Sequence, residues 1–248
     1  MAEEEQSSWA RDLWAFLLTA ACALSWVALV KSLVRLRILS TSSLRKLLHI
    51  GTGPIYLACW NLFTTAERAR WLACLVPLGL TLKFAAVGLG LLHDPDTVNS
   101  MARNGKPTEL LRGPFLYGMV FVATTVLFWG NSPTGICMLM LLCGGDGFAE
   151  VVGRLYGRHR LPHNSQKSWE GSIACFFFSI LFQGIFLYWF RSLGWFVDGT
   201  DDLQSIIFWT SLVGTFVESL PVLSFFDNLT VPLSAYFVIR LLRVLSFH

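Results

Sequence analysis

The stretch from Cys143 to Ser172 is polar, lies between two apolar segments and reads CGGDGFAEVVGRLYGRHRLPHNSQKSWEGS. Asp146 and Glu150 are four residues apart, so on a helix their carboxylates share one face. Charge at the edge of a membrane is costly without a task. Mg²⁺ is usually held by one or two carboxylates together with substrate phosphates. The spacing therefore predicts a metal site at Asp146 and Glu150, and phosphate chemistry on a lipid-soluble molecule.

Further along this stretch, Pro162 marks a break that is followed by Lys167, Ser168 and Gly171. A lysine ammonium, a hydroxyl and a glycine that lets the backbone approach closely would form a phosphate cradle at the start of the next helix. A second interpretation stays open, in which the loop is a basic membrane-surface loop and Ser168 only caps that helix.

The carboxylates need an element that holds them at membrane depth. The apolar run Thr134 to Cys143 leads directly into Gly144, Gly145, Asp146 and Gly147 and then returns to helical periodicity. This pattern predicts an interrupted helix, which a membrane tolerates where the freed backbone lines a polar cavity. The alternative is that Asp146 is an N-cap and that Glu150 supports the first turn of the next helix.

The composition defines the class of protein. Of 248 residues, 54% are hydrophobic and 14% are charged, against about 25% charged in soluble domains. The apolar runs approach the ~20 residues that a spanning helix needs, and they do not alternate as β-barrel strands do. We therefore expect an all-α, polytopic bundle of about seven or eight spanning helices, some interrupted, in one domain over residues 1–248. The runs from Thr134 and from Ile206 look too short to span alone.

Basic residues orient this bundle by the positive-inside rule. They gather in the connections 31–46, 103–112 and 154–167, which share one face if there are eight spans. That face is the cytosolic or stromal one, where nucleotides are available. The net charge of +3 reports this topology, so we expect no nucleic-acid partner.

The stretch Cys143 to Ser172 resembles the signature of the phytol kinase and farnesol kinase family, which is related to dolichol kinases and more distantly to CDP-diacylglycerol synthases. GGDG and KSWEGS bring it closer to the phytol kinase branch. The similarity runs from about Leu44 to the C-terminus, beyond the first span and basic connection in residues 1–43. The supporting stretches are LRKLLHIG from Leu44, SMARNGKPTELLRGP from Ser100, NSP from Asn131 and VESLPVLSFFDNLTVP from Val217.

This resemblance implies a multi-span enzyme that transfers the terminal phosphate of CTP, or of UTP, to the primary hydroxyl of a polyprenyl-type alcohol. It also implies a plastid membrane, where phytyl phosphate feeds phytol salvage into tocopherol. Mg²⁺ would serve as cofactor, and the alcohol would enter from among the membrane lipids. Alternatives are a farnesol, geranylgeraniol or dolichol kinase, a membrane cytidylyltransferase, or a transporter that uses broken helices and Lys83.

With the resemblance, individual positions gain candidate roles. Lys83 lies within a span and is either a functional group or a lysine that reaches to the interface. Glu218 and Asp227 flank Pro221 in a second interrupted region, which is expected to face the first. The chain departs from the family pattern at Glu150, where Asp is common, and at Phe226, where a second acidic residue is common. The predicted catalytic residues are Asp146, Lys167 and Asp227, the metal ligands Asp146 and Glu150, and the nucleotide or phosphate contacts Gly144, Gly145, Gly147, Arg154, Asn164, Lys167, Ser168, Gly171, Lys83 and His49.

Overall fold

The computed structural model describes residues 2–130, 132–195, 202–221 and 226–246. Asn131 of the NSP stretch and residues 222–225 of the stretch from Val217 lie outside the described residues. The chain divides into two compact units, Met1–Trp129 and Gly130–His248, and each is considered by itself.

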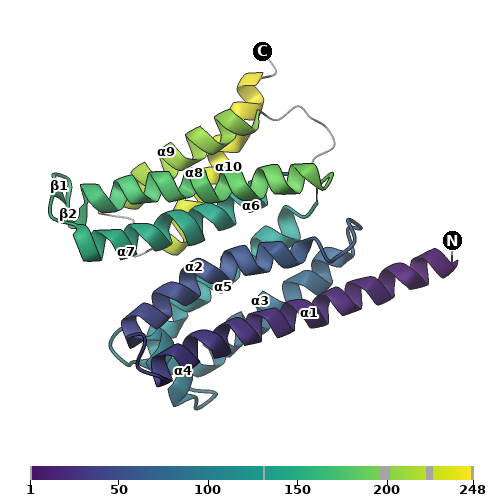
Figure 1. Cartoon of the computed structure of the whole chain (residues 1–248), viewed down its shortest axis with the longest axis horizontal. Coiled ribbons are helices and arrows are strands. Elements are labelled where there is room, and N and C mark those ends of the chain that lie inside the picture. The colour runs from purple at the N-terminus through teal and green to yellow at the C-terminus, as the bar shows by residue number, and fades with distance from the viewer. Residues whose placement is uncertain (1, 131, 196–201, 222–225, 247–248) are drawn as a thin grey trace. The chain divides into compact units, whose positions relative to one another are not determined.

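The N-terminal unit is built from long apolar helices, drawn in purple to teal in Figure 1. Helix α1 packs against α2 and α3, and α3 packs against α5. Gly118 permits the close approach of α5 to α3, since a Cβ there would lie 2.1 Å from Thr81 Oγ1. The elements are α1 (Ala2–Arg35), α2 (Thr41–Trp60), α3 (Ala69–Gly88), α4 (Pro95–Met101), the 3₁₀ helix η1 (Pro107–Leu111) and α5 (Gly113–Leu127).

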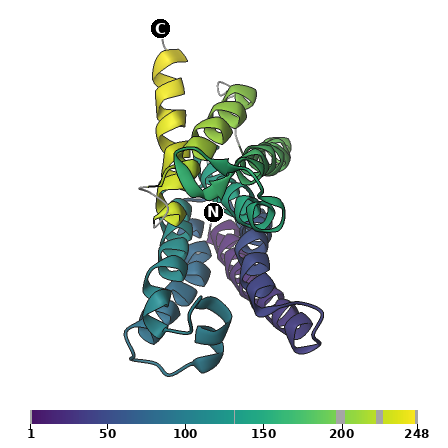
Figure 2. The same ribbon diagram turned by 90° about the vertical axis from the view of Figure 1, so that its left-hand side faces the viewer.

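The C-terminal unit carries a second set of helices and a short hairpin, and the hairpin faces the viewer in Figure 2. Helix α7 packs against α8, α8 against α9, α9 against α10, and α10 against α6. The hairpin connects α7 to α8 and pairs its two strands antiparallel. The elements are α6 (Thr134–Met140), η2 (Leu141–Asp146), α7 (Gly147–Tyr156), β1 (Arg160–Leu161), β2 (Asn164–Ser168), α8 (Trp169–Ser192), α9 (Leu203–Ser219) and α10 (Asp227–Ser246).

The predicted all-α membrane bundle is confirmed. Within the described residues, six helical stretches are long and apolar enough to cross a bilayer: Ser8–Arg35, Ala69–Gly88, Pro107–Leu127, Thr134–Tyr156, Trp169–Ser192 and Asp227–Leu245. Helices α2, with 20 residues, and α9, with 17, add two further long helices. Length and hydropathy thus single out six spans among the described residues, fewer than the predicted seven or eight.

The interruption predicted around GGDG takes the form of a π-helix rather than a loss of helical structure. Residues Leu141–Asp146 form one π-helical segment, so the apolar run from Thr134 continues through it to Tyr156 as a 23-residue stretch. The run that looked too short to span is therefore extended by its own polar motif. Single-turn π segments inside α-helices occur frequently at functional sites, and this one ends on Asp146.

Candidate functional site

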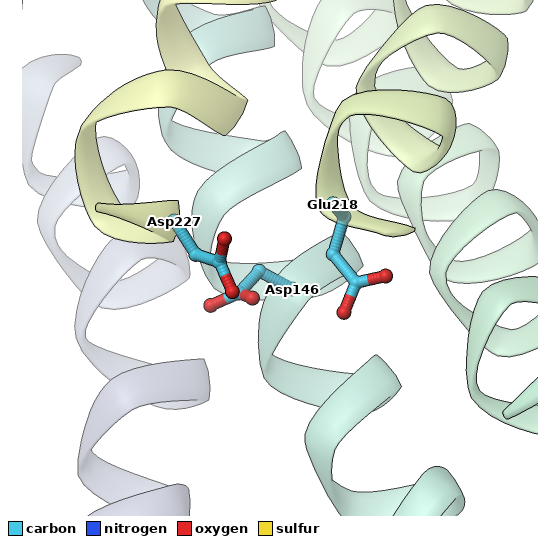
Figure 3. A group of neighbouring side chains, drawn as sticks. All are labelled: Asp146, Glu218 and Asp227. Atoms are coloured by element: carbon cyan, nitrogen blue, oxygen red, sulfur yellow. The ribbon is translucent and has the colours of Figure 1, made fainter. Parts of the chain in front are cut away.

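Three carboxylates from different elements of the C-terminal unit converge on one point. Asp146 ends the π-helix η2, Glu218 lies in the last turn of α9, and Asp227 is the first residue of α10. Each offers a carboxylate oxygen, and these oxygens all lie within 4.8 Å of one another. Figure 3 shows the three side chains pointing toward a common space. We call Asp146, Glu218 and Asp227 the acidic group.

Lys167 of strand β2 reaches into the acidic group. Its Nζ lies 2.5 Å from Glu218 Oε1 and 2.9 Å from Asp227 Oδ2. Burial alone would lower the pKa of this lysine, but the charges of Glu218, Asp146 and Asp227 outweigh burial and raise the pKa above its ordinary value. Lys167 is therefore a fixed positive charge next to the carboxylates.

Two carboxylates of the acidic group lie in surroundings where charge needs compensation. Glu218 is only 3% exposed. Asp227 Oδ1 is buried and accepts no hydrogen bond from any described residue. A buried charge without compensation is strongly unfavourable. An all-oxygen donor set that includes a buried oxygen without a hydrogen-bond partner fits a hard divalent cation such as Mg²⁺.

The hairpin is fastened to the end of α9 beside the acidic group. Asn164 is buried and donates from Nδ2 to Ser219 O at 3.0 Å, while its Oδ1 accepts from Gln166 N at 3.1 Å. His163 Nε2 lies 3.0 Å from Ser219 Oγ. Because Lys167 follows on the same strand and Glu218 precedes Ser219, these contacts fix the distance between the ammonium and the carboxylate.

Two glycines of GGDG hold the π-helix close against α8. A Cβ on Gly145 would lie 2.3 Å from Ser179 Oγ, and a Cβ on Gly144 would lie 2.9 Å from Phe182 Cγ. Both glycines are buried. The structure thus gives these positions a packing role that sets the place of Asp146, whereas the sequence predicted contact with the nucleotide.

Other predicted site residues of this unit are not members of the acidic group. Glu150 and Arg154 are exposed on α7, one and two turns beyond Asp146, so the geometry favours Glu218 and Asp227 over Glu150 as partners of Asp146. Gly147 is buried at the start of α7.

Ser168 and Gly171, the two other members of the predicted phosphate cradle, have local roles at the start of α8. Ser168 caps the helix, since its Oγ accepts from Gly171 N at 3.2 Å. A Cβ on Gly171 would meet the α7 backbone, 3.1 Å from Ala149 O. These contacts match the capping alternative that the sequence left open.

Two predicted phosphate contacts belong to the N-terminal unit. Lys83 Nζ lies 2.7 Å from Asp94 Oδ2. The backbone oxygen of His49 accepts a hydrogen bond of 2.7 Å from Tyr117 Oη, and the two rings lie 4.7 Å apart. Their assignment to the site stays a prediction.

Sequence reasoning found the second interrupted region but left Glu218 out of the proposed site. The signal was present, because an acidic residue at the end of an apolar span and next to a break is unusual. His163 and Ser219 gave no comparable signal, since a loop histidine and a helix-terminal serine are ordinary. Their contacts depend on tertiary structure.

Comparison with known proteins shows the family of the chain. Residues 9–222 match the model of a family described as the cytidylyltransferase family. A probable phytol kinase 1, chloroplastic, of Oryza sativa subsp. japonica is 39% identical over 233 residues, which are 94% of this chain and 74% of that protein. Phytol kinase 1, chloroplastic, of Arabidopsis thaliana is 34% identical over 224 residues, 90% of this chain and 74% of its own length.

A farnesol kinase, chloroplastic, of Arabidopsis thaliana is also 34% identical, over 226 residues that are 90% of this chain and 73% of that protein. No solved structure matches the chain significantly. The fold is thus that of a polytopic membrane protein. The chain belongs to the cytidylyltransferase family, within its phytol kinase and farnesol kinase branch.

Proposed function

We propose that this protein is a prenyl alcohol kinase that uses CTP to phosphorylate phytol in a chloroplast membrane. The proposal is supported by phytol kinase and farnesol kinase relatives with chloroplastic names and by the family of the matched model. The observation that carries it is the acidic group with Lys167, because phosphoryl transfer requires positioning and charge neutralisation more than covalent help.

In the proposed reaction, the alcohol oxygen attacks the γ-phosphorus of CTP. A phosphorus–oxygen bond forms to the alcohol, the bond to the bridging oxygen of CDP breaks, and a carboxylate of the acidic group accepts the hydroxyl proton. Lys167 offsets charge on the phosphates. The acidic group would hold Mg²⁺, which supplies charge neutralisation and orientation for the nucleotide phosphates when bound.

The long apolar helices allow the alcohol to approach from the bilayer with its isoprenoid tail in a lipid-like environment. Only the hydroxyl must reach the acidic group. Phytyl phosphate formed there would feed phytol salvage and tocopherol synthesis.

The test is incubation of the purified full chain in detergent with CTP, Mg²⁺ and, separately, phytol, geranylgeraniol and farnesol. We expect formation of prenyl phosphate and CDP, with the highest kcat/KM for phytol. UTP and ATP in place of CTP define the nucleotide. Absence of any prenyl phosphate with all three alcohols and all three nucleotides would overturn the proposal.

A cytidylyltransferase acting on a lipid phosphate is the second candidate, because the matched family model bears that description. This enzyme would break the bond between the α- and β-phosphates and release pyrophosphate, whereas a kinase releases CDP. The same assay, with phosphatidic acid or prenyl phosphate as the acceptor, distinguishes the two by the nucleotide product.

A further inference from the structure

The hairpin that carries Lys167 is too short to keep its shape by itself. Strands β1 and β2 pair Arg160 with Ser168 and Leu161 with Asn164, and the register is irregular between these two pairs. A two-stranded hairpin alone is at best marginally stable in water. The place of Lys167 therefore depends on contacts that fasten the hairpin to the helices beside it (Figure 1).

One such contact lies at the base of the hairpin, in the first turn of α8. Glu170 accepts a hydrogen bond from His159 N, at 3.2 Å to Oε1 and 3.4 Å to Oε2, and its Oε1 lies 2.7 Å from His159 Nδ1. In turn, His159 O accepts from Trp169 N at 3.0 Å. The residue just before β1 is thus held to α8 through both of its backbone polar groups.

Lys167 lies midway between two anchors of the hairpin. Three residues before it, Asn164 is bonded to Ser219 at the end of α9, and three residues after it, Glu170 holds His159. A lysine ammonium stands on a flexible four-carbon stem. The backbone on both sides of Lys167 must therefore be fixed if its ammonium is to keep one place.

We propose that Glu170 is a positioning residue, which holds the base of the hairpin so that the Lys167 ammonium stays at the acidic group. In the stretch KSWEGS, Lys167 then supplies the ammonium, Ser168 caps α8 and Glu170 fastens the hairpin. This inference rests on the proposed function, because the ammonium that Glu170 positions is the one assigned to offset charge on the phosphates.

An acidic residue in the first turn of a helix also stabilises that helix through its charge alone. The two roles depend on different properties of the side chain. Positioning depends on reach, because an oxygen must arrive at His159 N, whereas helix stabilisation depends on negative charge. Glu170→Gln keeps the reach and loses the charge. Glu170→Asp keeps the charge but is shorter by one methylene.

The first experiment measures kcat for phosphate transfer from CTP to phytol by these two variants, per folded full chain in detergent. We expect Glu170→Gln to stay close to the wild type. Glu170→Asp should lose about tenfold, since a misplacement of ~1 Å in a catalytic group can cost 100-fold. Equal rates in the two variants, or the reverse order, would overturn the proposal.

A double-mutant cycle with Lys167→Met tests whether Glu170 acts through the lysine. With γ-labelled CTP to detect low rates, Glu170→Asp should change the rate of Lys167→Met by less than about twofold, the usual limit of additivity. The reason is that no ammonium remains to be misplaced. The same tenfold loss in both backgrounds would overturn the proposal, because Glu170 would then act independently of Lys167.

Asp202→Ala is the matched control in the same unit. The Asp202 carboxylate caps the start of α9 by accepting from Gln204 N and Ser205 N, whereas the hairpin is bonded to Ser219 at the other end of that helix. We expect the control to keep the wild-type kcat per folded protein. A tenfold loss in Asp202→Ala would overturn the proposal, because loosening any helix start would then have the same effect.

Backbone hydrogen exchange distinguishes failure of this inference from failure of the proposed function. Without nucleotide or alcohol, the amides of residues 158–168 should exchange faster in Glu170→Asp than in Glu170→Gln. If they do and the wild type makes no prenyl phosphate, Glu170 holds the hairpin and the kinase assignment fails. If the wild type makes phytyl phosphate and the two variants exchange alike, the kinase assignment stands and the role of Glu170 is wrong.

Discussion

The two units place lysine–carboxylate pairs in contrasting surroundings. In the N-terminal unit, Lys83 pairs with Asp94, the side chains are 43% and 21% exposed, and both Asp94 oxygens accept hydrogen bonds from Thr97. In the C-terminal unit, Lys167 faces three carboxylates, Glu218 is 3% exposed, and Asp227 Oδ1 has no partner among the described residues. The first pair is satisfied by local contacts, whereas the second set leaves a buried carboxylate oxygen unsatisfied.

The difference separates a structural ion pair from a candidate site. Asp94 caps α4 and holds Lys83 at the surface, so each charge is compensated locally. The three carboxylates of the acidic group come from three different elements. Their proximity is unfavourable by itself, because like charges repel. Such an arrangement is tolerated where a ligand completes it, and the following predictions test that contrast.

The largest effect is expected from Lys167→Met. The substitution removes the ammonium that pairs with the buried Glu218 carboxylate, and breaking a buried pair costs about 3 kcal/mol or more of stability. We expect phosphoryl transfer to fall at least ~100-fold, as when one electrostatic contact to a transition state is lost. Initial rates and thermal unfolding in detergent check both expectations.

Lys83→Met is the matched change in the other unit. The pair is partly exposed, so its loss costs no more than ~1 kcal/mol of stability after screening. A loss of turnover as large as that of Lys167→Met would support the prediction from the sequence that Lys83 contacts the nucleotide or phosphate. It would also contradict the contrast drawn between the two lysines.

Gly145→Ala tests the packing that places Asp146. The added Cβ would lie 2.3 Å from Ser179 Oγ, so the π-helix or α8 must shift, and a shift of ~1 Å in a catalytic group can cost 100-fold in rate. The double variant Gly145→Ala with Ser179→Ala removes that oxygen and is expected to recover most of the turnover. Gly184→Ala is the control, because a Cβ there meets nothing within 4 Å.

Asn164→Ala is expected to have an intermediate effect. It removes the hydrogen bond to Ser219 O and leaves a buried acceptor unpaired, at a cost of about 1–3 kcal/mol. If Asn164 positions Lys167, kcat falls while KM for CTP changes little. A rise in KM for CTP at unchanged kcat and stability would instead support the predicted nucleotide contact.

The smallest effect is expected from Asp94→Asn, which keeps an N-cap but removes the charge. The hydrogen bond from Lys83 holds the pKa of Asp94 well below its ordinary value. A depressed carboxyl pKa stabilises the fold above the unfolded value near ~3.9 and loses that contribution as pH falls through the folded pKa. The variant should be less stable than wild type by up to ~1 kcal/mol at neutral pH. Thermal unfolding at a series of pH values should show this gap closing in acid, and a gap that widens would be inconsistent with the pair.

The sequence predicted the class of fold well, because apolar runs and charge depletion are local signals. The sequence predicted a broken helix at GGDG, whereas the chain stays helical there as a π-helix. This form depends on the packing of Gly144 and Gly145 against α8, which periodicity does not contain. Lys167 and Asp227 were named, and both contact or belong to the acidic group.

The prediction was weakest where partners are distant in the chain. Glu150 was chosen as the partner of Asp146 because the spacing of four residues is visible in the sequence. Glu218 lies 72 positions after Asp146 and reaches it only through the packing of α9. Local spacing can propose a pair of ligands, but tertiary structure decides which carboxylates meet.

The most direct test of the central claim is the Mg²⁺-dependent rate of phosphate transfer from CTP to phytol in the wild type and in Asp146→Asn, with Glu150→Gln as the matched variant. We expect Asp146→Asn to lose at least ~100-fold in rate while it still folds and inserts, and Glu150→Gln to retain most of the activity. Near-normal transfer by Asp146→Asn would contradict the account.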